Sequence, residues 1–476
     1  MSARPRRRTK IVATLGPATR EPDQIEALID AGVDVFRLNF SHGTPPEHAE
    51  AVKRIRAASK KLGREVGILG DLPGPKLRLG DLEEGFAVLH SGSVIEMSGD
   101  DGVGNAEHLP VQFAGITKAV NPGDPVFLAD GRVRLKVLEI SGPNVKLEVE
   151  AGGAVSSHQG VNLPGADAEL PDAGSHDEEW IEFACANDID LLAVSFVRRP
   201  SDLELVKSKV EAQGADIPLI AKIEKPQAAE RAEEIIAAAT GGIMVARGDL
   251  GVELPVEEVP GTQKRLIKLA GQASKPVITA TQMLATMVKA SQPSRAEVTD
   301  VANAIYDGTD AVMLSEETAI GEHPLEVVRV MDRIARRTEE QLPYGDWVFN
   351  RVDTKADDVA EAVAQVAVAA TYRLGLAAIV VPTGSGRTAR LVSAFRPREP
   401  VLAVSSNPAT VRRMNLLFGV SAAIAEPWTR LRQLLDECAL LAREHGVAKS
   451  GDLIAITAGL PELELGTNLF EVHRVP

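Results

Sequence analysis

The sequence predicts an α/β protein whose largest part is a (β/α)8 barrel, and three observations support this. Eight short apolar runs, most of them followed by an amphipathic helix, recur over residues 9–75 and about 166–340. Polar residues stand at the ends of several runs, and a long stretch without helical periodicity separates the third run from the fourth. Eight strands close a TIM barrel, whose sites lie at the carboxyl ends of the strands. An open, doubly wound sheet is the alternative on pattern alone.

The first repeat unit shows the pattern in full. "TKIVATLG" is typical of a strand, and "EPDQIEALIDAG" of a helix with Pro22 near its first turn and Gly32 as its stop. Ile25, Leu28 and Ile29 share one helix face. The next strand is "DVFRLNFS". The later runs are "VGILGD", "DLLAVSFV", "PLIAKIE", "GGIMVARGD", "PVITATQ" and "DAVMLSEE". Between them we expect helices in "PSDLELVKSKVEAQ", "PQAAERAEEIIAAA", "TQKRLIKLAGQA" and "RAEVTDVANAIY".

Two further domains accompany the barrel, which we assign to residues 1–76 and 166–345. Residues 77–165 are rich in Val and Leu, and "VFLADGRVRLKVLEI" alternates on both sides of an Asp-Gly, which predicts a hairpin. This predicts a small β-barrel domain inserted in a barrel loop, where it would serve as a lid; a decorative insertion is the alternative. Residues 352–476 alternate helix and strand again and predict a separate C-terminal α/β domain.

Composition limits the class of protein. The 476 residues are 44% hydrophobic and 25% charged, which is typical of globular domains. The net charge of −15 argues against general nucleic-acid or anionic-membrane binding. The basic start "MSARPRRRTK" precedes no apolar segment, so we expect no secretory signal, and no apolar run is long enough to span a membrane. Two distant cysteines, Cys185 and Cys438, suggest buried thiols in a reducing, cytoplasmic compartment.

Charged and polar residues recur two apart at the ends of the predicted strands. Residues two apart on a strand face the same side, and burying an unpaired charge costs several kcal/mol or more. We therefore expect one shared polar pocket. The pocket residues expected from these four runs are Arg37, Asn39 and Ser41; Lys222 and Glu224; Arg247 and Asp249, provided that their strand continues that far; and Thr279 and Thr281.

The residue types in this pocket point to phosphoryl chemistry. Glu224 and Asp249 would repel each other unless a cation lies between them, and oxygen ligands without Cys or His suit Mg²⁺ or Mn²⁺. Arg37, Lys222 and Arg247 would add positive charge on the same face. Cations with a divalent metal are what phosphoryl transfer requires. A structural salt bridge is the alternative for any single pair, such as Lys222 with Glu224.

Two short motifs lie outside these strand ends. In "GDLPGPKLRLG" (70–80), Asp71 precedes two prolines, and Lys76 and Arg78 point to one side of an extended chain. "TGSGRT" follows a predicted strand and opens a helix, so its backbone N–H groups are placed to bind a phosphate; a tight connection is the alternative. It is not a Walker A loop. Its candidate phosphate contacts are Thr383, Ser385, Gly386, Arg387 and Thr388.

Long motifs resemble pyruvate kinase over nearly the whole chain. They are "TKIVATLGPATR", "DVFRLNFSHG", "GVNLPG", "LIAKIE", "IMVARGDLGVELP", "PVITATQML" and "PSRAEVTDVANAIYDGTDAVMLSEETAIGEHPLE". The resemblance implies phosphoryl transfer from phosphoenolpyruvate to ADP, with ATP and pyruvate as products. A Mg²⁺-dependent pyruvate-enolate aldolase or lyase is the competing enzyme class, but it leaves Arg78, the insertion and the C-terminal domain unexplained. A degenerate regulatory subunit is disfavoured because the matched catalytic residues are present.

The resemblance implies a role for each matching residue. Arg37, Lys222 and Thr281 match catalytic residues, and Gly248 and Asp249 match substrate contacts. Glu224 and Asp249 match the metal ligands. Asn39, Ser41 and Asp71 match a monovalent-cation site, and Asn39, His42 and Arg78 match nucleotide contacts. A sugar-phosphate effector at 383–388, a homotetramer and a cytoplasmic location are also implied.

The chain departs from the family pattern near Asp71. K⁺-dependent members have Asp-Thr-Lys-Gly-Pro-Glu where this chain has "DLPGPK", so Leu72 replaces Thr and Lys76 replaces Glu. Leu79 replaces a further Thr. We therefore expect the chain to belong to a K⁺-independent subgroup in which the Lys76 ammonium replaces the ion; pairing of Lys76 with a surface acid is the alternative. Gln159 replaces a nucleotide-facing lysine, and Glu316 replaces a glycine. The C-terminal end lacks the Trp-Arg-Pro-Gly loop of fructose-bisphosphate-regulated members. This argues against fructose 1,6-bisphosphate as the effector and leaves a sugar monophosphate or AMP as alternatives.

Overall fold

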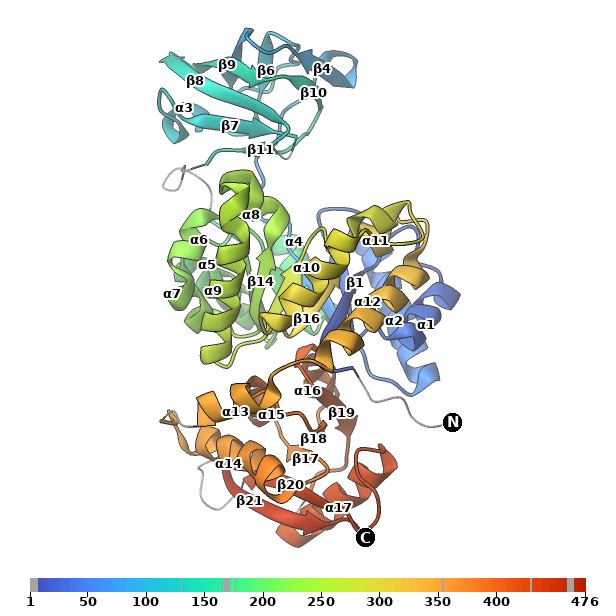
Figure 1. Cartoon of the computed structure of the whole chain (residues 1–476). Coiled ribbons are helices and arrows are strands. Elements are labelled where there is room, and N and C mark those ends of the chain that lie inside the picture. The colour runs from blue at the N-terminus through green and yellow to red at the C-terminus, as the bar shows by residue number, and fades with distance from the viewer. Residues whose placement is uncertain are drawn as a thin grey trace.

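The chain folds into three stacked parts in a computed structural model (Figure 1). The structure describes residues 7–129, 131–164, 166, 172–175, 177–352, 355–428, 430–459 and 466–476. The lid lies at one end of the central barrel and the C-terminal domain at the other. No helix in these ranges is long and apolar enough to cross a membrane. Cys185 and Cys438 are both unpaired; Cys438 is buried, but Cys185 is only half-buried.

All eight predicted strands form a closed parallel barrel, which confirms the expected fold and excludes the open sheet. Each strand pairs with its chain neighbours, and β1 closes the ring against β16. The strands are β1 (Lys10–Thr14), β2 (Val35–Asn39), β3 (Gly67–Asp71), β12 (Leu191–Val194), β13 (Leu219–Ile223), β14 (Gly242–Ala246), β15 (Val277–Ala280) and β16 (Ala311–Leu314).

Helices surround the barrel and cover its outer face. They are α1 (Pro22–Ala31), α2 (Pro45–Leu62), α4 (Glu178–Ala186), α5 (Pro200–Ala212), α6 (Pro226–Glu230), α7 (Ala232–Ala238), α8 (Arg247–Glu253), α9 (Val259–Gln272), α10 (Arg295–Tyr306), α11 (Glu316–Ala319) and α12 (Pro324–Glu339), with 3-10 turns η2 (Val256–Glu258) and η3 (Ala285–Val288). The first helix begins at Pro22 and ends before Gly32, whose φ of 123° suits a glycine. The helix expected over 226–239 is interrupted at Arg231 and forms α6 and α7.

The lid forms a β domain around its own apolar core. Six strands lie in the order β11-β7-β8-β9-β5-β6, and β10 pairs separately with β4. The predicted hairpin is present, since β7 and β8 are antiparallel neighbours. The elements are η1 (Glu83–Gly85), β4 (Phe86–Leu89), β5 (Val94–Ser98), β6 (His108–Pro110), α3 (Ile116–Ala119), β7 (Pro125–Leu128), β8 (Val133–Ser141), β9 (Asn144–Ala151), β10 (Gly153–Ser156) and β11 (Val161–Asn162).

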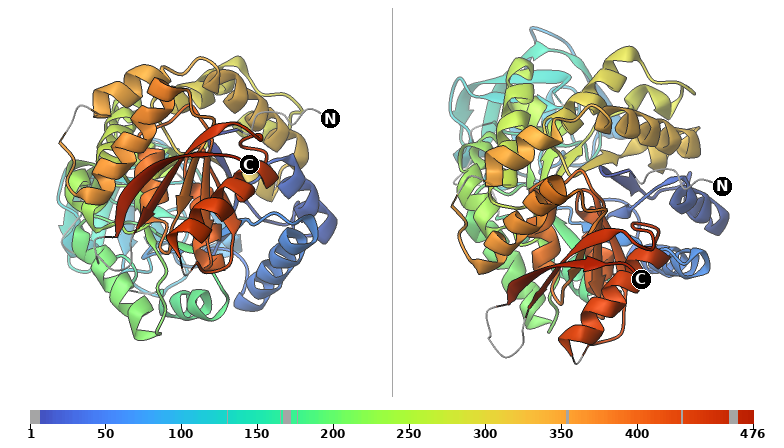
Figure 2. Two further views of the ribbon diagram at one scale, coloured as in Figure 1. Left: turned by 90° about the horizontal axis from the view of Figure 1, so that it is seen from below. Right: turned by 60° about the horizontal axis from the view of Figure 1, so that its bottom comes forward.

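The C-terminal domain has a five-stranded sheet, β19-β18-β17-β20-β21, with separate cores on its two faces. Seen from below, it covers the floor of the barrel (Figure 2). Its elements are α13 (Tyr344–Val352), α14 (Val359–Leu374), β17 (Ile379–Pro382), α15 (Arg387–Ala394), β18 (Val401–Ser405), α16 (Pro408–Arg413), η4 (Met414–Leu416), β19 (Val420–Ile424), α17 (Leu431–Glu444), β20 (Leu453–Gly459) and β21 (Thr467–Arg474).

Candidate active site

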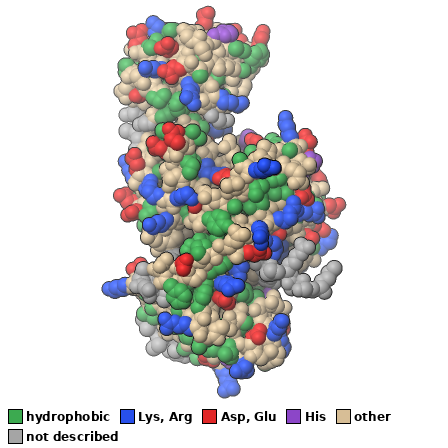
Figure 3. Space-filling view, in the orientation of Figure 1, with side chains coloured by type: hydrophobic (Ala, Val, Ile, Leu, Met, Phe, Trp, Pro, Cys, Tyr) green, Lys and Arg blue, Asp and Glu red, His purple; other side chains and the backbone are tan. Residues whose placement is uncertain are grey.

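The candidate site lies at the carboxyl ends of the barrel strands, beneath the lid. Inside the barrel, Val12, Val35, Leu69 and Ile220 belong to one fully buried apolar cluster. Strand residues alternate sides, so the residues two positions further along point inward one layer higher. This upper layer consists of Thr14, Arg37, Asp71 and Lys222. The space-filling view shows a notch between the lid and the barrel at this end (Figure 3).

Asp71 is the buried anion that links the cations of this layer. Its side chain is 1% exposed and pairs with Arg37 (Nε to Oδ2, 2.6 Å) and Lys222 (Nζ to Oδ1, 3.1 Å). Burial alone would raise the pKa of Asp71, but Lys222 and Arg37 hold this pKa below its ordinary value. Arg37 also donates to Thr14 Oγ1 at 3.1 Å. Asp71 therefore stays ionised and orients both cations.

Lys222 contacts three oxygen-bearing side chains at once. Its Nζ lies 2.7 Å from Glu224 Oε1 and donates to Ser195 Oγ at 2.7 Å, in addition to the contact with Asp71. Burial would lower the pKa of Lys222, yet the carboxylates of Asp71 and Glu224 raise this pKa above its ordinary value. The ammonium is therefore permanently charged and is held in place by fixed partners, as a preorganised electrostatic catalyst should be.

Glu224 and Asp249 are two carboxylates that repel each other at this end of the barrel. Burial raises the pKa of Glu224, and the Asp249 carboxylate raises it further, against the opposing effect of Lys222. Glu224 Oε2 accepts the Phe196 backbone N–H at 2.8 Å. Within the described ranges, the Asp249 carboxylate has no hydrogen bond or ion pair. No group of three or more His, Cys, Asp or Glu side chains in those ranges is arranged so that it could hold a metal ion by itself. Two carboxylates fit Mg²⁺, which keeps several waters and substrate oxygens among its ligands.

Arg247, Gly248 and Asp249 form the first turn of α8, so the condition for strand alternation of Arg247 and Asp249 is not met. β14 ends at Ala246, so Arg247 and Asp249 are helical and do not alternate on a strand. Arg247 instead pairs with Asp300 (2.7 Å) and donates to the Thr281 carbonyl (2.7 Å). Arg247 therefore connects the start of α8 to α10 and to the loop after β15, and the Asp300 carboxylate compensates its charge. The carboxylate of Asp249 stays near Glu224 although the strand does not extend to it.

Thr281 lies at the site, but its expected partner Thr279 does not. Ile278 and Ala280 belong to the cluster inside the barrel, so Thr279 faces the helices and donates to Thr309 Oγ1 (2.9 Å). The shared face predicted for Thr279 and Thr281 is therefore wrong. Thr281 follows the strand with a φ of +67°, and its hydroxyl accepts the Gly248 N–H at 2.7 Å. A left-handed non-glycine residue is strained and is often found at functional sites.

The residues matched to nucleotide binding lie on two separate segments. Asn39 lies opposite Asp71 in the β2–β3 register, and its side chain accepts the Ser41 N–H at 3.2 Å. Ser41 and His42 are exposed at the mouth of the barrel. Arg78 lies in the segment that leads from β3 into the lid (residues 72–78, here called the neck of the lid). Its guanidinium donates to the His158 carbonyl at 3.1 Å. The structure therefore attaches Arg78 to the lid, so its guanidinium would move with that domain.

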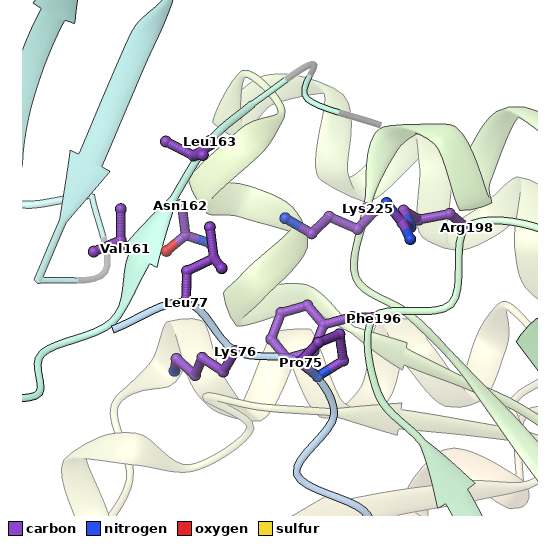
Figure 4. A pocket seen from close by; sticks show the side chains of 9 residues that line it. All are labelled: Pro75, Lys76, Leu77, Val161, Asn162, Leu163, Phe196, Arg198 and Lys225. Atoms are coloured by element: carbon purple, nitrogen blue, oxygen red, sulfur yellow. The ribbon is translucent and has the colours of Figure 1, made fainter. Parts of the chain in front are cut away.

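The neck of the lid also carries Lys76 and Leu72. Leu72 is 1% exposed. The side chain of Lys76 lies against Gly160 and points away from Lys225 and Arg198 (Figure 4). Within the residues that the structure describes, Lys76 forms no ion pair, and Asp71 pairs with Arg37 and Lys222 instead. Asp71 and Lys76 therefore form no ion pair in this arrangement of the lid.

The predicted effector loop joins β17 to α15. Gly386 has a φ of +83° and donates its N–H to Thr383 Oγ1 (3.0 Å), while Ser385 and Arg387 are exposed. Arg387 forms an ion pair with Asp358. Thr388 is buried, and its hydroxyl contacts that of Thr467. Ser385 and Arg387 are thus exposed to solvent, although Arg387 is paired with Asp358, whereas the Thr388 side chain is buried against Thr467.

The sequence reasoning missed Ser195 and Thr14. Ser195 accepts from Lys222 and donates to the Leu72 carbonyl (2.6 Å), so it links β12, β13 and β3. Thr14 is the partner of Arg37. Both are single polar residues at the ends of predicted strands. Arg37 and Lys222 were predicted because each has a polar residue two positions further along its strand. A criterion that accepts a single polar residue at a strand end would also have identified Ser195 and Thr14.

Comparisons with known proteins agree with this geometry. The family model described as "Pyruvate kinase, barrel domain" matches residues 6–328, and "Pyruvate kinase, alpha/beta domain" matches residues 361–473. A pyruvate kinase of Geobacillus stearothermophilus is 43% identical over 99% of this chain and 81% of its own length. One from Thermotoga maritima is 39% identical over 98% of this chain and 100% of its own. A crystal structure of a pyruvate kinase from Cryptosporidium parvum superposes with a TM-score of 0.94 at 34% identity, covering 99% of this chain and 96% of that one. The chain belongs to the pyruvate kinase family and is a phosphotransferase.

Proposed function

We propose that the chain transfers the phosphoryl group of phosphoenolpyruvate to ADP, giving ATP and pyruvate, as the last step of glycolysis. The observation that carries this is the linked set of charges at the barrel mouth. Arg37 and Lys222 are held by one buried aspartate, and Glu224 faces an Asp249 carboxylate that has no hydrogen bond or ion pair in the described ranges. Fixed cations next to a place for a divalent ion suit a phosphoryl group that carries spread negative charge.

The residues divide the work by position. Arg37 binds the substrate and the phosphoryl group in transfer, and Lys222 stabilises the charge that develops on the phosphoryl and enolate oxygens. Both cations are ordered before substrate arrives, so little reorganisation is needed at the moment of reaction. Thr281, with Gly248 bound to its hydroxyl, lies where it can orient the substrate and relay the proton that converts enolate into pyruvate.

A divalent cation, Mg²⁺ or Mn²⁺, would be held by Glu224 and Asp249. Bound there, it neutralises charge on the substrate and on the phosphoryl group. The mutual repulsion that raises the Glu224 pKa would turn into joint attraction for such an ion.

The lid and the barrel mouth would bind the nucleotide together. Asn39 and His42 offer contacts from the barrel, and Arg78 offers one from the neck of the lid. We therefore divide the chain into a catalytic barrel (1–76 and 166–345), a lid (77–165) that closes over ADP, and a regulatory domain (352–476). Gln159 would give the lid a weaker hold on ADP than a lysine would.

We further propose that activity does not require K⁺. Asn39, Ser41 and Asp71 match a monovalent-cation site, but Leu72 presents a buried apolar side chain where K⁺-dependent members have Thr. Arg37 and Lys222 already compensate Asp71, and Lys76 would add a tethered charge when the lid closes. A tethered charge does not depend on salt by mass action. The test is an assay with Mg²⁺ and tetramethylammonium as the only monovalent cation; strong stimulation by KCl would refute K⁺ independence.

Regulation by a phosphorylated metabolite at Thr383–Thr388 is a separate proposal. The exposed Ser385 and Arg387 at the start of α15 support it. Saturation with phosphoenolpyruvate should be measured with sugar monophosphates, AMP and fructose 1,6-bisphosphate in turn, and the proposal fails if no metabolite shifts the curve. We also propose a cytoplasmic homotetramer without nucleic-acid or membrane partners.

The direct test of the activity is ATP formation by the purified chain from phosphoenolpyruvate and ADP with Mg²⁺. The expected result is stoichiometric ATP and pyruvate, with both lost when Mg²⁺ is chelated. Aldol cleavage or condensation of pyruvate without ATP formation would instead identify the aldolase or lyase class. The geometry favours the kinase, because an aldolase has no use for Arg78 in the neck of a lid.

A further inference from the structure

The short helix α8 holds Asp249 in place, although it has only seven residues. So short a helix is marginal by itself, and its position depends on tertiary contacts. Leu250 packs it from beneath, with no exposed surface. Leu250 is the only buried residue of α8, so the contacts at the two ends of the helix help to fix the direction in which Asp249 points.

The first turn of α8 is fastened by the contacts of Arg247 and Gly248. The Arg247 guanidinium reaches Asp300 on α10, and the Gly248 N–H donates to Thr281. These contacts tie the start of α8 to the loop after β15 and to the neighbouring helix. They do not tie it to β13, the strand that leads to Glu224.

The last residue of α8 supplies the missing connection to β13. Glu253 forms an ion pair with Lys225, the residue directly after Glu224. The side chains are 1% exposed for Glu253 and 9% for Lys225, so the pair lies in a low-dielectric setting. Glu253 Oε2 has no partner in the described part of the chain, which leaves Lys225 as the cation that compensates this buried acid.

Lys225 also touches the segment that holds the other oxygen of Glu224. Its ammonium lies 5.6 Å from the centre of the Phe196 ring, and the Phe196 N–H donates to Glu224 Oε2. The close-up shows Lys225 extending above this ring, on the side of the pocket opposite Lys76 (Figure 4). Lys225 therefore joins three segments: the loop after β12, the end of β13 and the end of α8.

We propose that Lys225 and Glu253 are positioning residues for the divalent cation, because they fix the Asp249 carboxylate against that of Glu224. Like charges repel, so the carboxylates of Glu224 at the end of β13 and Asp249 on α8 favour separation of these two elements. The buried Lys225–Glu253 pair opposes that separation. Replacing a residue that orients a metal ligand typically lowers the metal affinity about 10- to 100-fold.

This inference rests on the proposed metal role of Glu224 and Asp249, so the test separates the two. Mn²⁺ binding to the substrate-free chain is measured by electron paramagnetic resonance, which reports free Mn²⁺ and needs no activity. Glu224→Gln should abolish the site. Lys225→Met and Glu253→Gln should each raise the Kd for Mn²⁺ about tenfold or more, and Lys225→Arg should keep it within about threefold.

Lys209→Met is the matched control, since Lys209 pairs with Glu178 on α4, outside the set of contacts that holds α8. It should leave the Kd unchanged. An unchanged Kd in Lys225→Met and Glu253→Gln, with only a lowered Tm, would overturn the positioning role. If Glu224→Gln still binds Mn²⁺ like the wild type, the proposed metal site itself is wrong. Should Lys225→Met fail to fold, Glu253→Gln and Lys225→Arg still decide the question.

Discussion

The two ends of the barrel use the same residue types for different purposes. At the amino ends of the strands, Asp34, Asp190 and Asp310 precede β2, β12 and β16, and each is buried against arginine. Each also accepts a backbone N–H from a neighbouring strand: Ile11, Ile68 and Val277, respectively. At the carboxyl ends, Glu224 repels Asp249, and Asp249 has no hydrogen-bond or ion-pair partner in the described ranges.

The difference shows which property separates a structural carboxylate from a functional one. Burial does not, since Asp310 and Glu224 are 4% and 2% exposed. The partners of the oxygens do: the lower acids have fixed cations and backbone donors, whereas Asp249, beside Glu224, has neither within the described ranges. Arg396 and Arg412 of the C-terminal domain supply two of the lower cations, so the floor of the barrel is also an interdomain joint.

The largest effect should come from removing Lys222. Lys222→Met leaves the transferring group without its fixed cation and leaves Asp71 and Glu224 less compensated, so kcat should fall by about 10³-fold or more. A coupled assay for ATP formation measures it, and circular dichroism should show a folded chain. Substantial turnover in this variant would show that the chemistry does not pass through this end of the barrel as described.

Replacing a cation at the amino ends of the strands should lower the stability of the chain and leave its activity unchanged. Arg396→Met leaves Asp310 buried without its cation, and breaking a buried pair of this kind costs about 3–5 kcal/mol. A thermal scan should therefore show a Tm several degrees lower, while kcat per folded chain stays near the wild-type value at low temperature. If kcat falls as steeply as in Lys222→Met, the division between the two ends is wrong.

Ser195→Ala should have a moderate effect on activity. The hydroxyl orients Lys222 but bears no charge, and one hydrogen bond contributes about 0.5–1.5 kcal/mol. We expect kcat to fall up to about tenfold, with little change in Tm, in the same coupled assay. Ser195→Thr, which keeps the hydroxyl, should be closer to the wild type; equal losses in both variants would point to packing.

The smallest effect is the pH dependence contributed by Asp34. Burial would raise its pKa, but Arg7, Lys10 and Arg64 hold this pKa below its ordinary value. Its stabilising contribution is therefore complete above the unfolded pKa of about 3.9 and is lost as pH falls through the lower folded pKa. The Tm difference between wild type and Asp34→Asn should shrink as pH falls below about 4. A constant difference down to pH 2 would contradict this account.

Much of this arrangement could be predicted from the sequence, and the reasons for the misses are physical. The eight strands follow from apolar runs, and Arg37, Lys222 and Glu224 follow from alternation along them. Alternation fails where the strand ends early, so it misplaced Arg247, which lies on a helix. It also fails for Thr279, because sequence alone does not say which face of a doubly buried strand points inward. The lower acids stayed unnoticed because their partners are distant in sequence, as with Asp310 and Arg396.

The most direct test of the account is a crystal of the chain soaked in Mn²⁺ and measured at the manganese absorption edge. We expect one anomalous peak per chain, between the carboxylates of Glu224 and Asp249, and none beside Asp34, Asp190 or Asp310. A peak at the lower acids, or no peak at Glu224 and Asp249 at saturating Mn²⁺, would contradict the claim that unsatisfied carboxylates mark the functional end of this barrel.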